Sequence, residues 1–135
     1  SVNFSISPET QVIDFGKFNL LDIRRHTMSK TFSIKTTKSQ NDQCTDGFKV
    51  SSSFYTEETL VEEDKALLIG NGLKLRLLDE NASPYTFNKY AEYADFTSDM
   101  LIYEKTYTAE LSSIAGTPIE AGPFDTVVLF KINYN

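Results

Sequence analysis

The C-terminal stretch Gly122-Pro123-Phe124-Asp125-Thr126-Val127-Val128-Leu129-Phe130-Lys131-Ile132-Asn133-Tyr134-Asn135 is the part of the sequence that decides the fold. Read as a β-strand, it directs alternate side chains to two opposite faces. One face is apolar along almost its full length and consists of Phe124, Thr126, Val128, Phe130, Ile132 and Tyr134. The other face is mixed, with Val127 and Leu129 in its middle. Such a strand needs a hydrophobic core under its first face, and it predicts a packed β-sheet protein.

The two edges of this strand pose a separate question. The segment comes last in the sequence, so we expect no hairpin after it to pair with its far edge. A long apolar edge strand is an aggregation hazard, and here only Lys131 supplies an edge charge. Two interpretations are open at this point. Either an earlier strand of the same chain pairs with the far edge, or a strand from another molecule completes the sheet by β-augmentation.

The rest of the chain repeats the period-two pattern between turn residues. It predicts roughly seven strands and almost no helix. The expected strands cover residues 2–6, 12–16, 31–35, 48–55, 73–77, 101–111 and 124–134. We expect a short helix or a solvated loop at residues 57–64, a turn at residues 70–72, and a long connection that includes a little strand at residues 81–95. The predicted architecture is an immunoglobulin-like antiparallel β-sandwich, folded as a single domain over residues 1–135.

Composition excludes several classes of partner. The chain has 135 residues, a formal net charge of -6 and a pI near 4.7, so a nucleic acid is not an expected partner. No apolar run approaches the roughly 18 residues of a membrane-spanning segment, and no leader precedes Ser1, so any secretion signal is expected outside this sequence. Cys44 is the only cysteine, which excludes a disulfide within the chain.

The sequence carries no pattern of catalytic chemistry. His26 stands alone, without the cysteines or carboxylates of a metal site, and no nucleophile, zinc or phosphate-binding motif occurs. We therefore expect no enzyme, no cofactor and no metal. An aromatic-rich stretch remains, in which side chains could either stack on a sugar ring or pack in the core: Tyr85, Phe87, Tyr90 and Tyr93. Of these two uses, core packing is the one that the mixed spacing favours.

The closing segment resembles the pilins of the chaperone-usher pathway. Their C-terminal signature is a glycine fourteen residues from the end, alternating hydrophobic residues and a penultimate tyrosine, which Gly122 and Tyr134 match. Val12-Ile13-Asp14-Phe15-Gly16 is similar to the end of the first strand in such subunits, and Gly72-Leu73-Lys74-Leu75-Arg76-Leu77 is similar to an inner strand. Two features depart from the family. Cys44 lacks the partner of the usual disulfide, and the N-terminal donor extension is nearly missing.

The resemblance implies an incomplete immunoglobulin-like fold that lacks its seventh strand. A donor strand from a partner would fill a hydrophobic groove beside the C-terminal strand, with floor residues Phe124, Val128, Phe130 and Ile132 and with Val12, Ile13 or Phe15 facing them. Tyr134 and Asn135 would anchor a periplasmic chaperone, and Gly122 would form the turn before the strand. The other implied partners are an usher and the neighbouring fimbrial subunits.

The function that follows from the resemblance is that of a structural or adhesive subunit of a surface fimbrium. It would be extracellular after assembly and periplasmic during assembly. The alternative is a lectin-like, carbohydrate-binding β-sandwich that acts as a tip adhesin on a host glycan or protein receptor. The short N-terminus leaves two further readings open: a chain trimmed of its donor strand, or the pilin-like domain of a longer adhesin.

Overall fold

The computed structural model describes residues 2–7, 11–14, 27–37, 48–96, 102–120, 122 and 124–134. This part of the chain contains ten β-strands and no helix. The strands are β1 (Val2–Ser7), β2 (Gln11–Asp14), β3 (Met28–Thr37), β4 (Phe48–Tyr55), β5 (Leu60–Val61), β6 (Ala66–Gly70), β7 (Leu73–Leu78), β8 (Ala91–Phe96), β9 (Ile102–Ser113) and β10 (Phe124–Tyr134).

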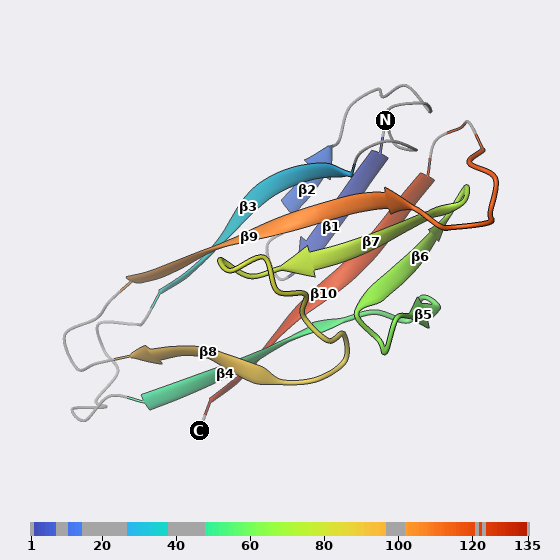
Figure 1. Ribbon diagram of the computed structural model, residues 1–135. Helices are drawn as coiled ribbons and strands as arrows, with labels where there is room; N and C mark the ends of the chain where they lie inside the picture. Colours follow the sequence, from blue (N-terminus) through green and yellow to red (C-terminus); the bar gives the residue numbers. More distant parts are fainter. Residues whose placement is uncertain are drawn as a thin grey trace.

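The strands form two five-stranded sheets that lie face to face. The first sheet has the order β2-β1-β10-β4-β8 and the second the order β3-β9-β7-β6-β5. Figure 1 shows the two layers, with β10 running behind β7 and β9. Neighbouring strands are antiparallel throughout, except that β1 runs parallel to β10. This arrangement confirms the predicted immunoglobulin-like β-sandwich.

The core lies between the sheets and is built from alternate residues of the central strands. In β7, Leu73, Leu75 and Leu77 are at most 1% exposed. They share the core with a cluster of aromatic rings centred on Tyr107 of the neighbouring β9. The Tyr107 ring lies 5.4 Å from that of Phe32 in the same sheet and 5.2 Å from that of Phe54 in the facing sheet. Apolar side chains that alternate on the inner faces of two packed sheets are what the period-two pattern predicts.

Several segments differ from the sequence-based expectation, among them β6, which was not predicted as a strand. Residues 57–64, expected as a helix or a loop, contain β5 and then a tight turn in which Glu62, Glu63 and Asp64 all have left-handed backbones, with φ values of 57°, 58° and 64°. This turn joins β5 to β6. The connection at residues 81–95 ends in β8, which pairs with β4. Very short strands carry too few residues for an alternation to be recognised. His26 and Cys44 lie outside the described residues.

The turn between β6 and β7 holds the loop that leads into β10. The backbone oxygen of Asn71 accepts a hydrogen bond of 3.0 Å from the Glu120 amide, and that of Gly72 accepts one of 3.1 Å from Ile114. The Asn71 side-chain amide also donates to the Gly122 carbonyl oxygen at 3.3 Å. The expected turn at residues 70–72 is therefore present, and it positions the start of the last strand.

Substituting Gly72 with alanine is predicted to weaken this attachment strongly. A Cβ at Gly72 would lie 2.2 Å from the carbonyl oxygen of Pro118, and φ is +76°. Gly116 is a matched control, because its φ is +77° and a Cβ there meets nothing within 4 Å. Gly116→Ala should cost about 1–2 kcal/mol of unfolding free energy for the left-handed backbone. Gly72→Ala should cost at least about 2 kcal/mol more because of the steric overlap.

Urea denaturation of both variants measures the difference. Equal losses of unfolding free energy would show that the loop before β10 can move away from Gly72 without cost.

Candidate functional site

The core face of β10 is the floor of the candidate site. Thr126, Val128 and Phe130 are 5%, 0% and 5% exposed, and Ile132 is partly buried against the same core. The Phe130 ring lies 5.4 Å from that of Phe54 on the neighbouring β4. Alternation along the strand therefore places the predicted face toward the opposite sheet.

The two edges of β10 are each paired along half of the strand. On one edge, β4 pairs antiparallel with the second half, from Leu129 opposite Tyr55 to Tyr134 opposite Val50. On the other edge, β1 pairs parallel with the first half, from Val2 opposite Phe124 to Ser7 opposite Leu129. Among the described residues, only Leu129 of β10 has a strand partner on both sides.

This pairing corrects the expectation of a vacant groove along the whole strand. An earlier strand of the same chain, β1, occupies the far edge beside residues 124–129. Beside residues 130–134 the far edge has no strand partner in the part of the chain that the structure describes. The alternation of residues 2–6 predicts that a strand exists there, but it carries no signal for which edge the strand joins, because strand periodicity fixes faces and not neighbours.

The other residues expected around the groove have different positions. Ile13 and Val12 lie in β2, opposite Phe4 and Ser5 of β1, so one strand separates them from β10. Tyr134 is the last residue of β10. Gly122 precedes the strand with a φ of +139°, a backbone that a glycine adopts without strain. Phe15 and Asn135 lie outside the described residues.

The four candidate sugar-binding aromatics do not share one exposed surface. Phe87 and Tyr93 are 1% and 2% exposed, whereas Tyr90 is 48% exposed. The Tyr85 ring packs 5.6 Å from that of Tyr107 inside the sandwich. Burial there, with the nearby Asp79 carboxylate, raises the pKa of Tyr85 to about 12. These positions favour the core-packing use of the stretch.

No group of three or more metal-ligating side chains occurs among the described residues. The same part of the chain also has no helix that is long and apolar enough to cross a membrane.

The strand order and the two-layer packing define an immunoglobulin-like β-sandwich of the kind found in pilus subunits. The P pilus rod subunit PapA has this fold, with a TM-score of 0.72, 18% sequence identity, and 93% of this chain and 92% of that chain covered. A chain in the structure of a chaperone-usher pilus matches with a TM-score of 0.66 and 18% identity, and the match covers 93% of this chain and 82% of that chain. No protein-family model matches the sequence.

Truncating the floor of the site is predicted to destabilise the whole fold. Phe130→Ala should lower the free energy of unfolding by about 3–5 kcal/mol, since it removes a buried ring and leaves a cavity. Asn133→Ala, three residues along the same strand on the exposed face, should change it by less than about 0.5 kcal/mol. Chemical denaturation of both variants measures this contrast. Similar losses would mean that the β10 floor is not part of the cooperative core.

Proposed function

We propose that this chain is a structural, non-enzymatic subunit of a surface fimbrium and that it assembles by accepting a β-strand from another subunit beside β10. The observation that carries the proposal is the incomplete edge of β10. Six residues of β1 pair with a strand of 11 residues, and they do so in the parallel orientation. The likeness in fold to pilus subunits supports the same reading.

The pairing of β1 is the weaker of two that the edge could accept. Parallel ladders have slanted hydrogen bonds and are slightly less stable per residue than antiparallel ones. A strand from another subunit can pair with β10 in either direction. In the antiparallel sense it could also cover the edge beside residues 130–134, which β1 leaves without a strand partner in the described chain.

Exchange of β1 between copies gives a route to a polymer. An element that pairs with its own chain can also pair with an identical chain, and a head-to-tail exchange of this kind grows open filaments. In this proposal β1 leaves its own β10, and the strand of a neighbouring subunit covers the floor formed by Val128, Phe130 and Ile132. Alternate side chains of the incoming strand supply specificity, and its backbone supplies the ladder.

The remaining partners belong to the same proposal. A periplasmic chaperone would hold the open edge of β10 during secretion, with Tyr134 and Asn135 as its anchor. An usher would exchange the chaperone for the next subunit, and the finished fimbrium would be extracellular. The position in the fimbrium, in the shaft or at the tip, is a separate matter that this mechanism does not depend on.

A disulfide lock tests whether β1 has to leave. Ser5 and Val127 are register partners in neighbouring strands, a spacing that suits a disulfide. In a Cys44→Ser background, Ser5→Cys with Val127→Cys should stay monomeric when oxidised and should form linear multimers when reduced. Electrophoresis without boiling and negative-stain electron microscopy measure the two states.

The matched control places the disulfide on the edge that does not exchange. Ser51 and Asn133 are register partners in β4 and β10, so Ser51→Cys with Asn133→Cys should assemble whether oxidised or reduced. A β1-locked chain that assembles as fast as its reduced form would refute release of β1. Failure of every variant to assemble would count against the fimbrial role itself.

A further inference from the structure

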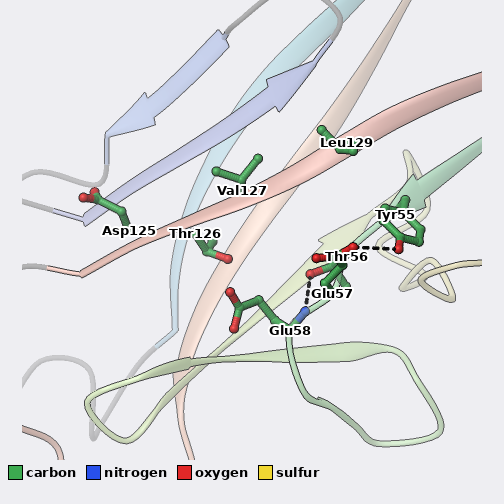
Figure 2. Close-up of a pocket in the computed structure, with 8 residues that line it drawn as sticks. All are labelled: Tyr55, Thr56, Glu57, Glu58, Asp125, Thr126, Val127 and Leu129. Atoms are coloured by element: carbon green, nitrogen blue, oxygen red, sulfur yellow. Dashed lines mark hydrogen bonds between the residues drawn. The ribbon is translucent and has the colours of Figure 1, made fainter.

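A pocket with a volume of about 360 Å³ lies at the other open edge of the last strand. Its walls are residues 55–58, which follow β4, and residues 125–127 and 129 of β10. β4 turns away from β10 beyond the pair Tyr55 and Leu129, so residues 124–128 have no strand partner on this side within the described chain. We refer to this hollow as the edge pocket (Figure 2).

The wall formed by residues 55–58 is held in place by one asparagine. The Thr56 amide donates to Asn88 Oδ1 at 2.8 Å, and Asn88 Nδ2 donates to the Thr56 carbonyl oxygen at 3.2 Å. The Glu58 amide then donates to Thr56 Oγ1 at 3.1 Å. Because both backbone groups of Thr56 are fixed, the Glu57 and Glu58 side chains start from a defined backbone.

The buried hydroxyl of Thr126 indicates that the edge pocket is suited to bind a hydrogen-bonding group. The residue is 5% exposed, it lines the pocket, and its Oγ1 has no hydrogen-bond partner in the described structure. Figure 2 shows this hydroxyl directed toward the Glu58 carboxylate. An unsatisfied buried hydroxyl is costly for a folded protein, and a donor placed between it and the carboxylate would satisfy both groups.

The charge and shape of the edge pocket specify the donor. Three carboxylates, of Glu57, Glu58 and Asp125, surround it, and no basic side chain is among its lining residues. Val127 and Leu129 add apolar surface and are 57% and 36% exposed. A lysine side chain combines an apolar stem with an ammonium group that has three donors and no acceptor.

The unpaired edge of β10 indicates how a partner segment that carries the lysine would bind. No loop backbone is hydrogen-bonded to residues 124–128 in the described part of the chain. The free N–H and C=O groups of a strand edge are a template for another extended segment. A partner segment that adds a short strand here would present one of its side chains to the pocket.

We propose that the edge pocket binds a lysine side chain carried on an extended segment of a partner protein, with the ammonium group between Glu58 and the Thr126 hydroxyl. The lysine side chain lies between β10 and residues 55–58, on the side of β10 to which Thr126 points, and the segment backbone pairs with residues 125–127. This site is separate from the edge that β1 occupies, so it can be tested on the monomer whether or not the chain polymerises.

The test is a titration of the ¹⁵N-labelled full chain with two peptides, followed by the amide signals of residues 56–58 and 125–129. The probe is acetyl-Val-Lys-Val-amide, and the matched control is acetyl-Val-norleucine-Val-amide, which keeps the stem and lacks the charge. We expect the lysine peptide to bind at least about fivefold more tightly, and 0.5 M NaCl should remove most of that difference because the charges are partly solvated. Equal binding of the two peptides, or no binding of either, would overturn the proposal.

Three variants locate the contact. Glu58→Gln and Thr126→Val should each weaken binding of the lysine peptide about three- to fivefold. Glu63→Gln alters a carboxylate that does not line the edge pocket, so it should leave the affinity for the peptide unchanged. Thr126→Val should also keep or raise the melting temperature of the free chain, since it replaces an unsatisfied hydroxyl by a methyl group. A loss of melting temperature in Thr126→Val, or wild-type affinity in Glu58→Gln, would refute the assignment.

Discussion

The requirement that one face of β10 lie against the second sheet constrains everything else in this molecule. Thr126, Val128 and Phe130 alternate along the strand, and all are buried. Because a shift of one residue would move all of them to the exposed face, the orientation of the strand is tightly specified. Its edges are not specified by burial, since backbone hydrogen bonds can be made to any strand that approaches. Burial therefore fixes which face of β10 forms the floor, but it does not fix which strands lie beside it.

The division of β10 at Leu129 follows from the geometry of its two neighbours. β4 pairs with β10 from Leu129 to Tyr134, whereas β1 pairs with it from Phe124 to Leu129. Each neighbour leaves the opposite half of the strand without a partner in the described chain. An exposed strand edge is normally blunted by charges, prolines or bulges. β10 has little of this protection, which is consistent with the proposed acceptance of other segments at its edges.

The sequence predicted which side chains of a strand point into the core better than it predicted which strands pair with one another. The bounds of β4 and β10 match the predicted ranges because both strands alternate over many residues. Very short strands such as β5 were missed, and burial of Phe87 and Tyr93 could not be separated from exposure of Tyr90 by spacing alone. The place of β1 beside β10 depends on a contact between the two ends of the sequence, which no local pattern encodes. The unsatisfied hydroxyl of Thr126 depends on where β4 diverges, a tertiary feature of the same kind.

β1 runs antiparallel to β2 and parallel to β10. The pairing with β2 does not set the second orientation, because β2 lies at the edge of the described sheet and would follow β1 in either direction. β1 pairs with only part of one edge of β10, and its parallel hydrogen-bond ladder is less stable than an antiparallel one. An antiparallel strand on the same edge would form the more stable ladder, and it is the pairing that the proposed assembly would reach.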